Sequence, residues 1–440
     1  MKIAAARLLL ASLVALAAAG CSDGADEEAP AAKQALVEVP GDAATIGEAL
    51  DLVAEDGMVL VGPGTYREQV LVRTPGVTLR GTDRNAVVIT GEGTRTAGVV
   101  GIADGVRVQN LTVTDTLLYG VLITGTHEGD EVLTPAEHGY DEFDPAAFPP
   151  LQRFRVDHVT ATNNGLYGIY AFNTQHGVIA DNWASGSADS GIYVGQCRDC
   201  DTLVQGNVTA RNAVGFENAN ASDSLTVVGN QLSHNRVGMT LTSNYQEAFV
   251  PQHGNLVAGN VIADNDEPQS PEQADGGFGI GVGIAGGQDN VLVRNLITGN
   301  PLVGVLLDGA EDVPSTGNRI ADNLLAGNGA DVANVSLPAA ATAGTCVVGP
   351  ASLRLVPAGL GLGCAAGVDP AATSADLPQL SAPAGVAFLD VPRPGALPSM
   401  TDTRQAPTPL PATIERPAAD AVRRPATDLL AAVLRAGGVR

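Results

Sequence analysis

The chain has 440 residues, enough for a large buried core, and carries 48 Asp and Glu against 24 Lys and Arg, a net charge of −24 at pH 7. A surface this acidic repels phosphates, which excludes nucleic acid as the expected partner. It also argues against unaided binding of polyuronates or anionic lipid head groups, unless bound cations reverse the charge locally.

The N-terminal residues have the pattern of an export signal. Lys2 and Arg7 give a basic start, an apolar stretch follows, and small residues come directly before Cys21. The stretch is too short for a spanning helix, so residues 1–20 are predicted to be a signal peptide. A cysteine at the cleavage position predicts a lipoprotein, because several acyl chains on Cys21 give stable membrane anchoring. Residues 21–38 are then a disordered tether, and the protein is exported and anchored to the cell membrane or envelope, or secreted if not lipidated.

The first predicted regular element is a helix over residues 43–53. Its apolar residues Ile46, Ala49, Leu50 and Val53 have helical spacing. The strand-like Val59–Tyr66 follows it. We expect the helix to cover the open end of a repetitive β-structure, where exposed strand edges would otherwise promote aggregation.

A short motif then recurs about every 24 residues. Each copy holds a β-type run, two small polar residues five positions apart, and a Gly-led apolar run such as Gly168–Ala171 or Gly191–Val194. The first polar position is occupied by Asn110, His158, Asn182, Asn207, Asn230, Asn260, Asn295 and Asn323. The second is occupied by Asp115, Asn163, Ser187, Asn212, Asn235, Asn265, Asn300 and Asn328.

This repeat predicts an all-β fold, a right-handed single-stranded parallel β-helix over residues 39–337. Each copy has room for about three short strands and none for a crossover helix, which is one coil of a solenoid. Coils stack about 4.8 Å apart, so like residues lie over like residues. Asparagine ladders are expected at the corners and aliphatic ladders inside.

The periodicity fades beyond residue 337. Residues 338–393 are predicted to form an irregular C-terminal cap, and residues 394–440 a Pro/Ala-rich tail whose first part, 394–425, is not expected to pack. Four cysteines remain after Cys21, an even number in an oxidising compartment. The simplest pairing joins Cys197 to Cys200 and Cys346 to Cys364. A structural clip is favoured over a redox-active pair at Cys197 and Cys200.

From Thr45 to Tyr66 the chain resembles the opening of pectin-lyase-fold proteins, where a capping helix leads into a Gly-Thr-Tyr turn. Three further motifs, Tyr167–Tyr170, Asp189–Gln196 and Asn212–Asn218, resemble the bacterial parallel β-helix repeat lipoproteins, and the likeness spans residues 40–335. The sequence departs from that family at Phe172, Cys197 and Cys200. The wider superfamily includes pectate lyases, polygalacturonases, uronan epimerases and NosD-type accessory proteins for copper-enzyme maturation, and the fold alone does not choose among them.

A candidate ligand-binding face follows from the alternation in the Gly-led strands. Ile169, Ile192 and Phe216 should point inward, so that their neighbours Tyr170, Tyr193 and Glu217 stack as an outward ladder. Aromatic rings cover the face of a sugar, while amides and carboxylates bind its hydroxyls. The alternative is that the tyrosines only shield coil edges. The predicted ligand-binding residues are Tyr167, Tyr170, Asn173, Tyr193, Gln196, Asn218 and Asn220.

Asp189 and Glu217 come from adjacent coils and form the candidate catalytic pair. Coil spacing allows separations of roughly 5–9 Å, the range that glycosidases use for acid and base. Either carboxylate could equally bond backbone amides at a corner. The sequence leaves open whether the protein is an enzyme; if it is one, the resemblance implies a polysaccharide lyase, hydrolase or epimerase.

Two acidic insertions, Gly125–Gln152 and Asp264–Phe278, interrupt the repeat. The carboxylates of the first would suit Ca²⁺, but their spacing matches no EF-type loop, and an acidic lid over the tyrosine ladder is the favoured interpretation. The second should border the same groove. No metal ligand is assigned, and four methionines with scattered histidines give copper little support.

The sequence therefore predicts a lipid-anchored extracytoplasmic β-helix that binds, and if catalytic processes, a carbohydrate polymer on an exposed face bearing Tyr170, Tyr193 and Glu217. The alternative is a non-catalytic, NosD-like scaffold or accessory protein that docks a partner protein in the cell envelope.

Overall fold

The computed structural model describes residues 32–133, 143–336, 343–361, 364, 375–378 and 380–426. The predicted signal peptide and Cys21 lie outside the described residues, as do residues 134–142 of the first insertion. Lys33–Arg440 forms one compact unit. Within the described ranges, no helix combines the length and the apolar character that crossing a membrane requires.

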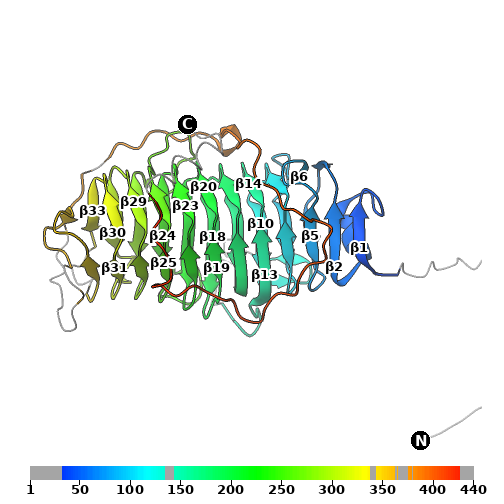
Figure 1. The fold of residues 1–440 in the computed structure, drawn as a ribbon, viewed down its shortest axis with the longest axis horizontal. Coiled ribbons are helices and arrows are strands. Elements are labelled where there is room, and N and C mark those ends of the chain that lie inside the picture. The colour runs from blue at the N-terminus through cyan, green and yellow to red at the C-terminus, as the bar shows by residue number, and fades with distance from the viewer. Residues whose placement is uncertain are drawn as a thin grey trace, which may run out of the picture. The chain divides into compact units, whose positions relative to one another are not determined.

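The chain winds as a right-handed β-helix through three parallel sheets, one strand of each per coil (Figure 1). Sheet A contains β1 (Gln34–Val39), β2 (Val53–Val61), β5 (Thr78–Gly81), β8 (Arg107–Gln109), β13 (Leu151–Asp157), β16 (Thr174–Ala180), β19 (Leu203–Gln205), β22 (Thr226–Val228), β25 (Leu256–Ala258), β28 (Val291–Val293), β31 (Arg319–Ala321) and β34 (Cys346–Val348). Sheet B contains β3 (Gly64–Tyr66), β6 (Val87–Thr90), β9 (Thr112–Thr114), β14 (Thr160–Thr162), β17 (Trp183–Ser185), β20 (Val208–Ala210), β23 (Gln231–Ser233), β26 (Val261–Ala263), β29 (Leu296–Thr298) and β32 (Leu324–Ala326).

Sheet C supports the candidate site. It contains β4 (Val70–Val72), β7 (Ala97–Gly101), β10 (Tyr119–Thr124), β15 (Tyr167–Phe172), β18 (Ser190–Cys197), β21 (Val214–Ala221), β24 (Val237–Thr242), β27 (Ile280–Ala285), β30 (Val303–Asp308), β33 (Ala330–Asn334) and β35 (Leu355–Val356). Outside the three sheets, a small antiparallel hairpin joins β11 (His127–Glu128) to β12 (Glu131–Val132) within the first insertion. The predicted all-β solenoid is confirmed.

The N-terminal end is covered by helix α1 (Ile46–Leu52), as the sequence predicts. The Thr45 hydroxyl accepts a hydrogen bond from the Glu48 backbone N–H, and the Glu48 carboxylate accepts one from the Thr45 backbone N–H. This capping box fixes where the helix begins. Ile46, Ala49 and Leu50 are buried against the first coil. The expected tether is wrong at its end, because β1 already pairs with β2 from Gln34.

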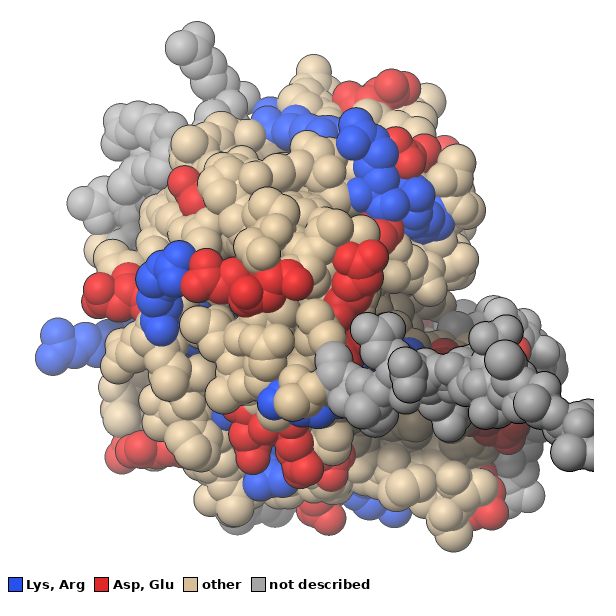
Figure 2. Space-filling model, turned by 90° about the vertical axis from the view of Figure 1, so that its right-hand side faces the viewer, with Lys and Arg blue, Asp and Glu red and all other residues tan. Residues whose placement is uncertain are grey.

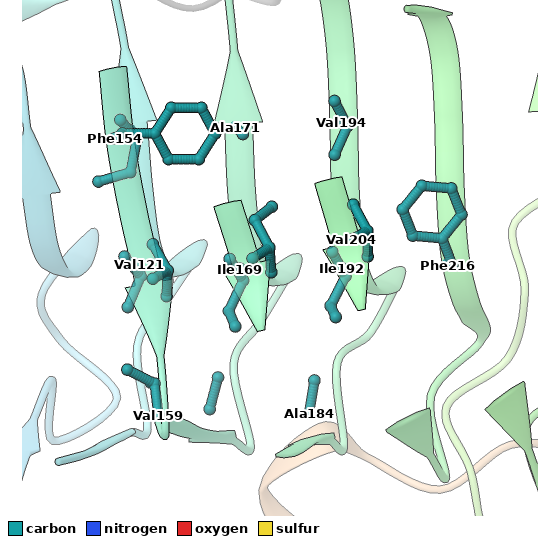
Figure 3. Close-up of a cluster of buried hydrophobic side chains, with 14 of the residues drawn as sticks. Val121, Phe154, Val159, Ile169, Ala171, Ala184, Ile192, Val194, Val204 and Phe216 are labelled. Atoms are coloured by element: carbon teal, nitrogen blue, oxygen red, sulfur yellow. The ribbon is translucent and has the colours of Figure 1, made fainter. Parts of the chain in front are cut away.

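Aliphatic side chains fill the interior of the coil in stacked rows (Figure 3). Val121, Ile169, Ile192 and Phe216 follow one another in register on successive strands of sheet C. Phe154 fits this interior because the next coil has glycine beneath it. A Cβ on Gly177 would lie 2.0 Å from Phe154 Cε1, so any larger residue there would displace the ring.

Asparagine ladders occupy two corners. At the first corner, each amide oxygen accepts from the backbone and side-chain N–H of the asparagine one coil earlier, as Asn230 does from Asn207 at 3.0 and 2.9 Å. The members are Asn182, Asn207, Asn230, Asn260, Asn295 and Asn323. The second corner has Asn212, Asn235, Asn265, Asn300 and Asn328. These buried amides are satisfied by one another.

The two residues predicted to begin the first asparagine ladder, Asn110 and His158, lie one position before the true ladder position. Strand register pairs Asp157 with Ala180, which places His158 over Asp181 rather than over Asn182. His158 and Asn110 have φ of 54° and 57° and provide the left-handed turn that precedes the ladder position. Asp115 and Asn163 are displaced in the same way at the second corner. Asparagine suits both positions, so composition could not separate them.

The coil extends further toward the C-terminus than expected. The coil continues past residue 337, because Cys346–Val348 pairs with β31 and Leu355–Val356 with β33. Cys346 is bonded to Cys364 and Cys197 to Cys200, as predicted.

Residues 380–426, here called the C-terminal strap, pack along the coil, so the expectation that 394–425 would not pack is wrong. The strap includes the 3-10 turn η2 (Phe388–Asp390). It runs to the N-terminal end of the coil and returns along sheet A (Figure 1). Hydrogen bonds join the strap to the coil along its length. In order along the strap, they connect Phe388 with Asn163, Leu397 with Asn85, Arg404 with Glu38, Ile414 with Asp201 and Arg424 with Asp322.

Arginines of the coil hold this strap. Proline has no N–H, so a Pro-rich segment presents carbonyls that need donors from elsewhere. Arg84 donates to Pro398 O, Arg80 to Thr403 O and Gln405 O, Arg107 to Thr408 O, and Arg294 to Ala419 O and Val422 O. Guanidinium groups, each with several N–H donors, replace the missing strand partner.

The end of the coil formed by β1 and β2 carries acidic and basic side chains side by side (Figure 2). Arg404 of the strap pairs there with Glu38, and Arg73 pairs with Asp51 at 2.7 Å. Such exposed pairs contribute little to stability, because water and salt screen their charges. They place the strap at this end without providing much of its binding energy.

Candidate functional site

The outer face of sheet C carries the predicted ladder. Register places Leu122, Tyr170, Tyr193, Glu217 and Thr240 over one another on β10, β15, β18, β21 and β24. Leu122, Tyr170 and Tyr193 lie outside the main core, in a separate hydrophobic cluster that includes Tyr119 and Phe172. The stacked coils therefore bring two tyrosines and a glutamate together from three segments of the chain.

The tyrosines form a compact aromatic cluster. Ring centroids of Tyr167 and Tyr193 are 4.6 Å apart, and Tyr170 meets Tyr193 edge-on at 4.9 Å. Such contacts are typical of favourable aromatic packing. The expected exposure is wrong, however, because Tyr170 is 4% and Tyr193 2% exposed. Tyr167 alone among these three is partly exposed.

A loop between β24 and β25 covers the two buried tyrosines. The Tyr193 hydroxyl donates to Glu247 Oε1, while Glu247 Oε2 is buried without a protein partner in the described chain. Burial, the largest cause, raises the pKa of Glu247 to about 8, although the Tyr193 hydrogen bond lowers it. Gly195 leaves no open space beside the ladder. A Cβ there would lie 2.4 Å from the Tyr193 ring and 2.9 Å from Glu247 Oε2.

Three of the predicted ligand-binding amides anchor covering loops instead. Asn173, Gln196 and Asn220 occupy one corner with left-handed φ of 52°, 48° and 50°. Asn173 donates to Phe148 O, and Gln196 accepts from the backbone N–H of Ala248. Asn220 donates to Glu247 O at 3.0 Å. The corner therefore fixes both the described part of the first insertion and the Glu247 loop.

Asn218 does not belong to the outer face. It pairs in register with the inward Val194, and its amide exchanges two hydrogen bonds with the backbone of Ala221, at 2.9 and 3.0 Å. The alternation that sends Glu217 outward sends its neighbour inward. Its buried amide is satisfied locally and is not available to a ligand.

The candidate carboxylate pair lies at the partly exposed edge of the cluster. Ser190 donates to Glu217 Oε2 and lies 3.3 Å from Asp189 Oδ1, so one hydroxyl connects the two acids. Burial raises the pKa of Asp189 to about 6. Burial and then the charge of Asp189 raise the pKa of Glu217 well above its usual range. The two groups titrate as a pair.

Both insertions border this face. Phe143 of the first meets Phe249 of the Glu247 loop at 6.1 Å, and Arg198 lies 5.3 Å from the Phe249 ring. The second insertion places Asp275 close enough to raise the pKa of Asp189 and Glu217. Its Ser270 accepts from the buried Arg236. The carboxyl-rich residues 134–142, which include His138, lie outside the described residues.

Glu247 is the functional candidate that the sequence analysis missed. It lies in a stretch without the repeat, so no periodicity marks it. The available signal was the longer step between Asn230 and Asn260, which shows that the coil is interrupted there.

The histidines that the structure describes do not form a metal centre. His158, His176 and His253 each pair with one aspartate, Asp157, Asp201 and Asp223 respectively. The four cysteines after Cys21 are bonded in pairs. No group of three or more His, Cys, Asp or Glu with metal-binding geometry occurs in the part of the chain that the structure describes. These residues therefore do not fit a copper ion.

The chain is similar to one protein family and to several solved structures. The family described as "Periplasmic copper-binding protein (NosD)" matches residues 58–276. The A-module of mannuronan C-5 epimerase AlgE6 from Azotobacter vinelandii is 16% identical, with a TM-score of 0.46, covering 67% of this chain and 84% of that one. DFA-IIIase from Arthrobacter chlorophenolicus A6, without its lid and in complex with GF2, is 15% identical with a TM-score of 0.46, covering 71% and 94%. No curated protein matches.

Proposed function

We propose that this NosD-like parallel β-helix protein binds a neutral carbohydrate polymer outside the cytoplasm, at the edge of sheet C around Tyr167, Asp189 and Glu217. The observation that carries the proposal is a partly exposed aromatic ring beside two partly exposed carboxylates. The Tyr167 ring lies 4.6 Å from the ring of Tyr193, which is the register partner of Glu217. Burial and next the charges of Glu217 and Asp189 raise the pKa of Tyr167. A ring of this kind packs on a pyranose face while the acids bind hydroxyls.

Asp189 and Glu217 also have the properties of an acid–base pair. Two carboxyl groups whose environments separate their pKa values can divide the roles of proton donor and acceptor. Glu217, whose pKa is raised well above its usual range, is assigned the role of proton donor, and Asp189, whose pKa is raised to about 6, that of acceptor. Processing of the bound polymer by hydrolysis, elimination or epimerisation would use this pair.

Binding is tested with a glycan array and the chain lacking its first 21 residues, with and without calcium. We expect at least one neutral polysaccharide to bind, and both Tyr167→Ala and Glu217→Gln to weaken its affinity at least ~10-fold, the equivalent of about 1.4 kcal/mol. Tyr245→Ala is the matched control, because Tyr245 is exposed and bonds Asp312 outside the cluster. Equal affinity in the Tyr167 variant and the wild type would exclude this surface.

A second candidate, a non-catalytic accessory protein that docks an envelope partner, is favoured by the burial of Tyr170 and Tyr193. Because the Glu247 loop covers them, the rings of Tyr170 and Tyr193 are not accessible to a sugar. An array without a single bound glycan supports this candidate over the first.

Anchoring through Cys21 is part of the proposal. A Cys at the predicted cleavage position becomes acylated in lipoproteins and holds the folded unit at the membrane. We expect a clickable palmitate analogue to label the wild-type protein and membranes to retain it. Cys21→Ser should abolish both. Labelling that persists in the variant would exclude Cys21 as the acylated residue.

A further inference from the structure

A cluster of arginines lies beneath the C-terminal strap, far from the tyrosine face. Arg107 and Arg155 are register partners on β8 and β13, and Arg80 on β5 aligns with Gln109. Their neighbours Leu79, Val108 and Val156 are fully buried in the core, so the arginines occupy the outer face of sheet A. The coil therefore stacks cationic groups in a protein whose overall charge is strongly negative.

A cavity of about 330 Å³ lies between these arginines and the strap. Its walls are Arg80, Arg107, Gln109 and Arg155 of the coil and residues 400–402 and 405–411 of the strap. This volume is many times the roughly 30 Å³ that one water molecule occupies in the liquid. It has room for an anion that carries a larger organic group.

The hydrogen bonds of two arginines are incomplete. Arg107 is 95% buried, and its Nη atoms donate to Gly76 O, Thr78 Oγ1 and Thr408 O, but its buried Nε has no partner among the described residues. The Arg155 side chain is 32% exposed and donates through Nε to Asp157, and its terminal nitrogens have no hydrogen bond to a protein atom within the described chain. Arg80, by contrast, is occupied by Gln109 and two strap carbonyls.

The local charge is also unbalanced. The pKa of Arg107 is lowered by burial first and then by Arg80, Arg155 and Arg153, while Asp56 raises it. The acid in the cavity lining is the exposed Asp402 of the strap. Asp157, beyond the lining, already accepts from Arg155 and Gln109. A buried guanidinium without a full set of acceptors is costly, and an oxoanion supplies both the acceptors and the opposite charge.

We propose that Arg107 and Arg155 bind a tetrahedral oxoanion, phosphate or sulfate, in the cavity beneath the C-terminal strap. The anion accepts from the terminal nitrogens of Arg155 and from the remaining N–H of Arg107 Nη2, and the two guanidinium groups lie on adjacent coils. The bound anion stabilises the packing of the strap on the coil, because Arg107 also donates to the strap at Thr408 O. The site is separate from the proposed carbohydrate site and does not depend on it.

The test uses the folded chain from residue 22, titrated calorimetrically with inorganic phosphate, with sulfate and with glucose 1-phosphate. Sodium chloride at matched ionic strength is the reference. We expect saturable binding of at least one oxoanion and a rise of Tm that follows its concentration, because a ligand of the native state stabilises it. Preference for glucose 1-phosphate would identify the natural ligand as an organic phosphate, and equal affinities would identify the free ion.

Arg155→Gln is the decisive variant, because Arg155 has no hydrogen bond to the strap and its loss leaves the strap carbonyls satisfied. Its affinity for the oxoanion should fall at least ~10-fold. Arg294→Gln is the matched control, since Arg294 holds the strap elsewhere on sheet A, outside the cavity. Unchanged affinity in Arg155→Gln, or equal stabilisation by chloride, overturns the proposal. Should Arg155→Gln fold poorly, Arg155→Lys, which keeps one charge but loses the planar donor set, gives the same comparison.

Discussion

Glu247→Gln is expected to make the protein more stable than the wild type by about 3–5 kcal/mol above pH 8, and equally stable below pH 4.5. The Glu247 carboxyl has a pKa of about 8 in the folded chain against an ordinary value of 4.5. The folded state therefore binds more protons than the unfolded state between these values. The stabilisation that comes from protonated Glu247 is complete below pH 4.5 and is lost as pH rises through 8.

Glutamine imitates the protonated acid, because its amide oxygen can still accept from the Tyr193 hydroxyl. The measurement is urea unfolding of both proteins at a series of pH values between 4 and 9. Glu415→Gln, the same substitution on an exposed part of the strap, is the control. The variant should retain some pH dependence in the same direction, because the pKa values of Asp189 and Glu217 are raised as well. Parallel stability curves for wild type and Glu247→Gln would show that Glu247 is not buried as an acid.

Asn230→Ala is expected to lower the free energy of unfolding by about 3–5 kcal/mol. The Asn230 oxygen accepts from two N–H groups of Asn207, and its Nδ2 donates to Val204 O and to Asn260 Oδ1. Alanine removes four hydrogen bonds and leaves buried donors and acceptors without partners. Each such buried group costs about 1–3 kcal/mol, and the neighbouring coils can relax only in part.

Gln205→Ala provides the control for this ladder prediction. Gln205 belongs to the coil of Asn207 but is exposed on β19, so its replacement should change stability by less than about 0.5 kcal/mol. Chemical denaturation at neutral pH measures both variants. A loss of less than 1 kcal/mol in Asn230→Ala would mean that water replaces the amide at the corner.

Much of the coil was predictable because its determinants are local and repeated. Tyr170, Tyr193 and Glu217 were assigned to one outer row from strand alternation and repeat length alone, and the strand pairing has that register. The prediction that Asn110 and His158 belong to the ladder was wrong by one residue. The turn residue and the ladder residue are neighbours, and the same polar residue types suit both. Only backbone conformation distinguishes them, since the turn residue needs a positive φ.

The sequence by itself determined the solenoid, its capping helix, its two disulfides and the row of residues on the outer face of sheet C. Each follows from short-range alternation, from stacking of equal repeats or from the scarcity of cysteine. Only the tertiary structure decided that the tyrosines are covered, that Glu247 meets Tyr193 and that the Pro-rich strap packs along the coil. These contacts join segments that share no repeat and are far apart in the chain, such as Arg404 and Glu38, so no local pattern records them.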